Sequence, residues 1–157
     1  MNFFKKSLLG TVAVAVLVSG SAFAEDNVVV KAAVTRWSPK VVFIKPGDSV
    51  TWKSMAGHDV ASIEGLIPEG AEPWEGKLGE ITTHKFTVPG VYVYQCIPHA
   101  SLGMEGVIVV GDGKGDPANL DAIVNSPKNK SITGLAIRTL QSALKKRAAG
   151  DTKTAFN

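Results

Sequence analysis

Hydrophobic and polar residues alternate in short segments along the first two thirds of the chain. Val50 and Trp52, for example, alternate with polar neighbours. Similar segments and short apolar runs, separated by turn sequences rich in proline and glycine, lie at residues 28–30, 41–44, 58–63, 82–88, 91–95 and 107–110. A period of two is typical of strands that bury one face. About seven short strands between residues 27 and 111 predict an all-β fold, a β-sandwich with Greek-key connections.

The hydrophobic period lengthens to about 3.6 residues after residue 113, which indicates helices. Asp116 is expected to cap a first helix that Pro127 ends. A second apolar stripe follows, made of Ile132, Leu135, Ala136, Thr139, Leu140, Ala143 and Leu144. We therefore predict two C-terminal α-helices within residues 116–147. We expect them to pack on an open face of the sandwich, the alternative being a partner-binding role for an exposed stripe.

Residues 1–24 have the features of a secretory signal peptide. Lys5 and Lys6 precede an apolar run at residues 8–18, and Ala22-Phe23-Ala24 fits a signal-peptidase site. The run is shorter than the ~20 residues that a membrane-spanning helix needs, which disfavours a single-pass anchor. The expected product is one domain, residues 25–157, outside the cytoplasm and with no membrane insertion after cleavage.

Charge and cysteine content narrow the function further. The leader holds two of the seventeen basic residues and none of the fourteen acids, so its removal lowers the formal charge from +3 to +1. This near balance argues against nucleic-acid binding, which requires a concentrated basic face. Cys96 is the single cysteine and cannot form an internal disulfide. It is a buried thiol, an intermolecular bridge or a metal ligand.

Four possible metal donors stand out in the sequence. Cys96, His99 and Met104 lie in one short segment, at intervals of three and five residues, and His58 lies upstream. Each has an ordinary structural explanation alone, but thiolate and thioether together select soft metals, and imidazole suits copper and zinc. Two imidazoles and a thiolate with a distant methionine form the geometry of an electron-transfer copper site. The sequence therefore predicts copper.

The same residues carry a resemblance to the type I (blue) copper proteins of the cupredoxin family, and among these to the pseudoazurins. The similar stretches are residues 46–51, 57–58, 67–72 and 88–92, the motif Cys96-x-Pro98-His99-x-x-Gly103-Met104, and the two C-terminal helices. The resemblance implies a cupredoxin domain with one type I copper ion, acting as a single-electron carrier in the periplasm rather than as an enzyme. Implied partners are redox proteins such as copper nitrite reductase, c-type cytochromes or periplasmic dehydrogenases, and a shuttling carrier is expected to be a monomer.

The resemblance also implies a surface where electrons enter and leave. His99 would lie at the surface end of the site, within an apolar patch to which Pro98, Ala100, Leu102 and Pro68 could contribute. Pro98 is in addition a candidate neighbour of the ligands. His84 is expected to be a surface residue, and Met55 to be packing rather than a fifth ligand.

Two positions depart from the family pattern. Asp59 follows His58 where the family usually has asparagine. A carboxylate near the thiolate would have a raised pKa, or would lower the copper potential, unless it points to solvent. The family's lysine-rich segment after Glu72 is reduced here to residues 73–77 with one lysine, Lys77. Trp74 in this segment is either an apolar docking anchor or ordinary loop packing.

Two rival functions remain open at this point. In one, Glu105 or Asp59 replaces Met104 as a ligand and leaves an open copper position for catalysis or sensing. In the other, the sandwich is a metal-free secreted binding module, because a fold alone does not establish function.

Overall fold

The computed structural model describes residues 25–112, 115–130 and 134–149. The predicted signal peptide and Ile132 of the predicted second helix lie outside the described residues. Within the described part there is no helix whose length and apolar character would let it cross a bilayer.

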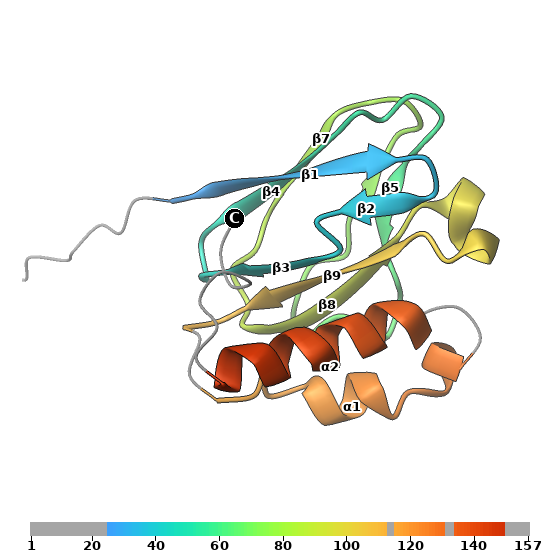
Figure 1. Ribbon diagram of the computed structural model, residues 1–157. Helices are drawn as coiled ribbons and strands as arrows, with labels where there is room; N and C mark the ends of the chain where they lie inside the picture. Colours follow the sequence, from blue (N-terminus) through green and yellow to red (C-terminus); the bar gives the residue numbers. More distant parts are fainter. Residues whose placement is uncertain (1–24, 113–114, 131–133, 150–157) are drawn as a thin grey trace, which may run out of the picture.

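Two β-sheets face each other, and two helices lie against one of them (Figure 1). The four-stranded sheet has the order β2 (Arg36–Ser38), β1 (Asn27–Ala33), β4 (Ser49–Lys53), β7 (Thr82–Lys85). The five-stranded sheet has the order β3 (Val41–Ile44), β9 (Glu105–Val110), β8 (Gly90–Gln95), β5 (Val60–Ser62), β6 (Glu75–Gly76). This arrangement confirms the predicted sandwich. The long connection between β5 and β7 contains the two-residue strand β6.

The helical region begins later than the sequence predicted. After residue 112 the described elements are α1 (Leu120–Val124), the 3₁₀ helix η2 (Pro127–Lys130) and α2 (Gly134–Ala148). Asp116 as a helix cap is wrong, because the Leu120 N–H donates to the Pro117 carbonyl in a turn before α1. That turn brings Asn119 to β8, where its side chain bonds both the N–H and the carbonyl of Val91 at 2.7 and 2.9 Å.

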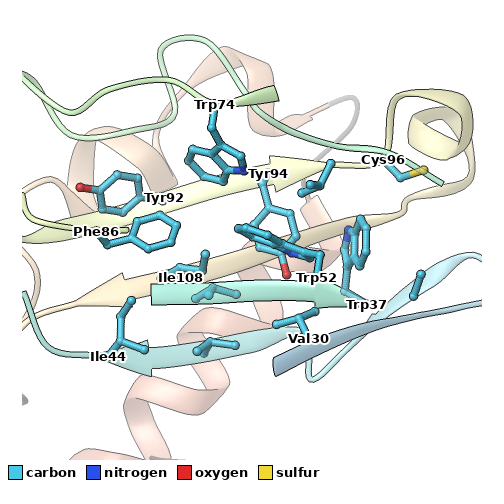
Figure 2. Close-up of a cluster of buried hydrophobic side chains, with 14 of the residues drawn as sticks. Val30, Trp37, Ile44, Trp52, Trp74, Phe86, Tyr92, Tyr94, Cys96 and Ile108 are labelled. Atoms are coloured by element: carbon cyan, nitrogen blue, oxygen red, sulfur yellow. The ribbon is translucent and has the colours of Figure 1, made fainter. Parts of the chain in front are cut away.

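The strand alternation of β8 separates two hydrophobic cores. Tyr92 and Tyr94 point into the space between the sheets, the inner core, whereas Val91 and Val93 point to the opposite face. On that face α2 packs against the five-stranded sheet through Ala136, Ile137, Leu140 and Ala143 and forms the outer core, whereas Leu135 of the predicted stripe is exposed. The expectation that the helices cover an open face of the sandwich is thus confirmed. The inner core is rich in aromatic rings and ends at Cys96 (Figure 2).

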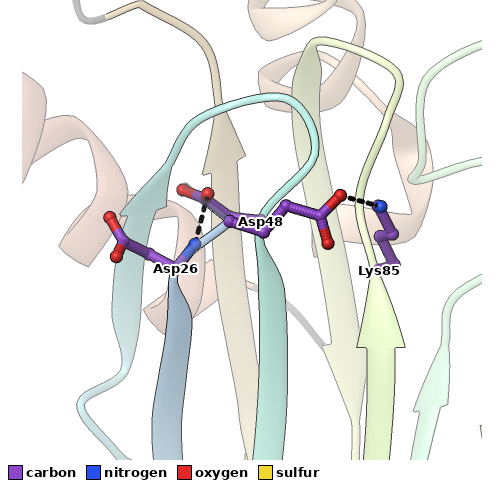
Figure 3. A network of polar contacts seen from close by, with 4 residues as sticks. Asp26, Asp48 and Lys85 are labelled. Atoms are coloured by element: carbon purple, nitrogen blue, oxygen red, sulfur yellow. Dashed lines mark hydrogen bonds and ion pairs between the residues drawn. The ribbon is translucent and has the colours of Figure 1, made fainter. Parts of the chain in front are cut away.

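A polar network lies at the end of the sandwich where β1 and β4 begin (Figure 3). The buried carboxylate of Asp48 accepts hydrogen bonds from the N–H groups of Asp26 and Lys45, at 3.0 and 2.8 Å. Lys85 forms an ion pair with Glu25. The start of β1 is thereby fastened to the turn before β4, so both strands run in register toward the opposite end, where His58 and Cys96 lie.

Candidate metal centre

Two loops at the far ends of β4 and β8 bring the predicted donors together. His58 follows a tight turn in which its N–H donates to the Met55 carbonyl at 2.8 Å. Cys96 follows β8 directly, and His99 lies on the 3₁₀ helix η1 (Ile97–Leu102). Gly103 then reverses the chain into β9 with a φ of 78°, a conformation that glycine adopts without steric cost.

Three donor atoms lie close enough to share one metal ion. The Cys96 sulfur is 3.6 Å from His58 Nδ1 and 3.2 Å from His99 Nδ1. All donor atoms of the three residues lie within 4.8 Å of one another. Metal bonds of ~2.0–2.3 Å to nitrogen and sulfur place neighbouring donors about 3–4 Å apart. The site thus fits a copper ion, and within the described residues no carboxylate joins this group.

Met104 is held beside these donors by its backbone. Its N–H donates to the His99 carbonyl at 3.3 Å, and its carbonyl accepts from the Cys96 N–H at 3.0 Å and from Trp37 Nε1 at 3.3 Å. The Met104 side chain is fully buried in the inner core, in the same cluster as Cys96. The predicted fourth donor is therefore buried and fastened by its backbone to the segment that carries Cys96 and His99.

Burial sets the protonation of the donors in the metal-free protein. Burial raises the pKa of the Cys96 thiol, and it lowers the pKa of His58, which the neighbouring His99 lowers further. Both shifts favour the uncharged groups. A neutral imidazole is already the form that binds metal, whereas the thiol must lose its proton on binding.

Asp59 ties the two ligand loops together. Its Oδ1 accepts a hydrogen bond from the Ile97 N–H at 2.7 Å, although the two residues are 38 positions apart in sequence. The side chain is buried, so the alternative that it points to solvent is wrong. An aspartate thus bridges the loops, and its charge raises the pKa of Cys96, after the larger effect of burial.

Glu105, the other carboxylate considered as a ligand, lies in β9 next to Met104. It is fully buried, and neither of its oxygens has a hydrogen-bond partner among the described residues. Burial raises its pKa to about 7, while the nearby Lys40 acts in the opposite direction. It does not belong to the donor group, so the structure does not support a carboxylate ligand.

The apolar surface near His99 differs in part from the predicted patch. Pro98 and Leu102 are exposed and Ala100 is half-buried, whereas Pro68 is buried and remote. A Cβ on Gly90 would lie 2.6 Å from Pro68 Cγ. Gly90 begins β8 and Cys96 follows its end, about 20 Å further at ~3.3 Å per residue. Pro68 as part of the patch is therefore wrong.

Trp74 is packing and not an exposed docking anchor. Only 8% of its surface is exposed, and its ring stacks on Trp52 and His84 at centroid distances of 5.8 and 4.8 Å. His84, expected at the surface, is half-buried by this stack. The predicted packing role of Met55 is confirmed by its place in the inner core.

Three exposed residues near the site were missed by the sequence reasoning. They are Ile97, Leu78 and Ile81, which are 47%, 62% and 66% exposed. Ile97 follows Cys96 directly, a signal that could have been used. The other two lie within two residues of Gly79, whose N–H donates to the His58 carbonyl at 2.8 Å, a contact that spacing does not reveal.

Comparisons of the sequence and of the fold with known proteins all indicate one family. A family model described as copper binding proteins, plastocyanin/azurin family, matches residues 24–111, more than half of the chain. The pseudoazurin of Methylorubrum extorquens is 37% identical over 95 residues, which cover 60% of this chain and 62% of that protein. The pseudoazurin of Paracoccus pantotrophus is 38% identical over 87 residues, covering 55% and 58%. The matched segment therefore spans less than two thirds of each relative's own length.

The fold comparison covers more of the chain. The crystal structure of a pseudoazurin from Methylobacterium extorquens matches with a TM-score of 0.65 and 30% identity, covering 77% of this chain and 98% of that one. The predicted resemblance to pseudoazurins and the prediction of copper are both confirmed. With its sandwich, its donor group and its family match, the chain belongs to the plastocyanin/azurin family of copper-binding proteins.

Proposed function

We propose that this protein is a periplasmic blue-copper electron carrier that shuttles single electrons between redox enzymes or cytochromes. The observation that carries the proposal is the group of two imidazoles and one thiol within 4.8 Å, held by two separate loops of a sandwich. His58, Cys96, His99 and Met104 are the proposed ligands of one copper ion. When bound, copper supplies a one-electron couple between Cu(I) and Cu(II).

The loops around the donors are restrained before any metal binds. Asp59 joins the His58 loop to Ile97, and the Cys96 N–H and the Met104 carbonyl bond each other across the second loop. A backbone bond from the His99 N–H to the Cys96 carbonyl, at 3.1 Å, closes the turn between these two donors. Restrained ligands keep one geometry in both oxidation states, which lowers the reorganisation that each electron transfer requires.

His99 is the proposed doorway for electrons. It is the least buried of the three donors that form the group, and it lies on η1 between exposed Pro98 and Leu102. An apolar rim of this kind lets a partner exclude water over the imidazole without a large desolvation cost. Partners are proposed to be redox proteins such as copper nitrite reductase, c-type cytochromes or periplasmic dehydrogenases, met by a monomer after signal cleavage between residues 24 and 25.

The direct test is the optical spectrum of the purified protein loaded with Cu(II). We expect an intense blue species that ascorbate bleaches and that reoxidation restores. Cys96→Ser should remove the intense colour, because the thiolate is the donor responsible for it, whereas His84→Gln, a loss of an imidazole outside the group, should keep it. A red or weakly coloured wild-type species, or no copper uptake, would contradict the carrier function.

A second experiment tests the proposed role of Asp59 beside the site. Asp59→Asn keeps an oxygen that can accept the Ile97 N–H but removes a negative charge close to the thiolate. The reduction potential should therefore rise, because the oxidised, more positive site loses a stabilising charge. Glu64→Gln removes an exposed charge and serves as the control. An unchanged potential in Asp59→Asn would show that this carboxylate does not tune the site.

A further inference from the structure

We propose that the turn at residues 77–81, called here the His58 turn, forms a second half of the docking surface. We further propose that this surface fits a redox protein whose docking face is apolar in the centre and flanked by lysines or arginines. The inference rests on the proposed function and adds to it the chemical class of the partner.

The His58 turn is fastened to a proposed ligand. The Glu80 N–H donates to the Lys77 carbonyl at 3.1 Å, and Gly79 has a φ of 82° at the third position, as in a type II turn. The Gly79 N–H donates to the carbonyl of His58 itself at 2.8 Å. A molecule that contacts this turn is therefore one hydrogen bond away from the backbone of His58.

The tip of the turn is apolar, although turn tips are normally polar. Leu78 occupies the second position and is 62% exposed, and Ile81 next to the turn is 66% exposed. The short helix η1 lies on the other side of the His58–Asp59 pair. The Ile97 N–H donates to the Asp59 side chain, Ile97 is 47% exposed, and Leu102 ends η1. Exposed apolar side chains thus flank the pair from two loops.

The exposed large hydrophobic residues are concentrated near the proposed metal site rather than spread over the surface. Seven large hydrophobic residues are exposed in the described parts of the chain, and four of them are Leu78, Ile81, Ile97 and Leu102. Exposed apolar residues scattered singly need no explanation, whereas a group beside a functional site marks an interaction surface. The two loops together make the docking surface broader than the His99 rim alone.

Charge specifies the partner. The segment from residue 72 to residue 80, which includes most of the His58 turn, crosses the outer edge of the five-stranded sheet at β6. It carries three exposed glutamates, Glu72, Glu75 and Glu80, against one exposed lysine, Lys77. The helical face has the opposite balance, with Lys128, Arg138, Lys145 and Lys146 exposed against Asp116 and Asp121. An acidic flank attracts a partner with a basic face and repels an acidic one, mainly by changing the association rate.

The first test removes the apolar half on the His58 side. Leu78→Ser with Ile81→Ser should slow electron exchange with a lysine-rich c-type cytochrome roughly tenfold, the change that about 1.4 kcal/mol of lost contact produces. Val29→Thr, at an exposed valine of β1 outside both loops, is the matched control and should leave the rate unchanged. An unchanged rate in the double variant would overturn the docking role of the turn.

The second test separates local from total charge. Glu75→Gln with Glu80→Gln and Asp116→Asn with Asp121→Asn each remove two exposed negative charges, but only the first pair lies near the His58 turn. The first pair should slow the reaction with the lysine-rich cytochrome roughly threefold at low salt and flatten its dependence on ionic strength. Equal effects of the two pairs, or a faster reaction of the wild type with an acidic cytochrome, would overturn the proposed partner charge.

Nuclear magnetic resonance of the unaltered copper(I) protein gives a reading that does not depend on variants. Titration with the lysine-rich cytochrome should shift the amide signals of Leu78, Gly79 and Ile81 together with those of η1. Shifts confined to η1 would overturn the inference and leave the carrier function intact. A protein that forms no blue copper site would instead contradict the proposed function, so the two failures are distinguishable.

Discussion

The two faces of the five-stranded sheet are covered by cores of different composition. The inner core contains Trp37, Trp52, Trp74, Phe86, Tyr92 and Tyr94, and it includes Cys96 and Met104. In the outer core the buried aromatic residue is Phe43, which lies 4.3 Å below the guanidinium of Arg147, and aliphatic residues and alanines make up the rest. Only the inner core contains proposed copper ligands.

The aromatic rings of the inner core form a connected array (Figure 2). Trp52 lies at its centre, with ring centroids 5.2 Å from Tyr94 and 5.8 Å from Trp74, and Trp37 is 5.5 Å from Tyr94. Gly106 makes room for one ring, because a Cβ there would lie 2.3 Å from Tyr94. Aromatic side chains have few rotamers and large contact areas, so they make a stiff support beneath the ligand loops.

The outer core serves a different purpose. Ala136 and Ala143 allow α2 to approach the sheet closely, while Leu140 fills the space between them. These contacts cover the second apolar face of the sheet without reaching the donors. Both cores therefore contribute to stability, whereas the inner core supports the geometry of the metal ligands.

The largest effect is expected from truncating the centre of the inner core. Trp52→Ala should lower the free energy of unfolding by about 3–5 kcal/mol, because it leaves a large cavity among rings that cannot collapse into it. The blue absorption band should also broaden or shift. Denaturant unfolding and the optical spectrum are the two measurements, and an unchanged spectrum would contradict the view that this core supports the site.

An equivalent change in the outer core should affect stability alone. Leu140→Ala should lower the free energy of unfolding by about 2–4 kcal/mol, since the Leu140 side chain of α2 is fully buried against the sheet. The position and intensity of the blue band should stay as in the wild type. A spectral change as large as that of Trp52→Ala would remove the distinction between the two cores.

The sequence predicted the strands and donors of the inner core better than it predicted the positions of Pro68 and Trp74. Alternation located most strands, and the spacing of Cys96, His99 and Met104 located the donors, because both are local patterns. The places of Pro68 and Trp74 depend instead on pairings far apart in the chain. Ser62 bonds the backbone of Trp74, and the Val93 N–H donates to the Leu66 carbonyl at 2.9 Å. No periodicity encodes such contacts.

A similar reason explains the helix cap. Asp116 and Pro117 have the composition of a helix start, but Asn119 bonds Val91 of β8 on both backbone atoms and fixes where α1 begins. A tertiary contact thus overrides a local preference. The bridging role of Asp59 could be suspected from its position next to His58, yet its partner Ile97 is visible only in the structure.

A smaller effect is expected where the inner core touches the ligand loop. Trp37→Phe keeps a ring but removes the hydrogen bond to the Met104 carbonyl, which still accepts from Cys96. The cost should be about 1 kcal/mol of unfolding free energy. The reduction potential should change measurably, whereas Phe43→Leu in the outer core should leave it unchanged. Equal reduction potentials in wild type and Trp37→Phe would show that Trp37 supports the ligand loop by packing alone.

The smallest effect is expected at the rim of the inner core, where His84 stacks on Trp74 with an interplanar angle of 20°. Burial lowers the pKa of His84, and Glu72 opposes this shift. In the unfolded chain the pKa is about 6.5. Below that pH the unfolded state binds a proton that the folded state excludes, so stability falls as the pH drops from 6.5 toward the lowered value.

His84→Gln isolates this contribution, because every other residue is the same in the two proteins. The difference in unfolding free energy between wild type and variant should be largest near pH 8 and should shrink toward pH 5. The copper site plays no part if both metal-free proteins are compared by denaturant unfolding across this range. A difference that does not change with pH would show that His84 binds its proton equally well in the folded and the unfolded state. The stack would then be a surface contact, and the inner core would end at Trp74.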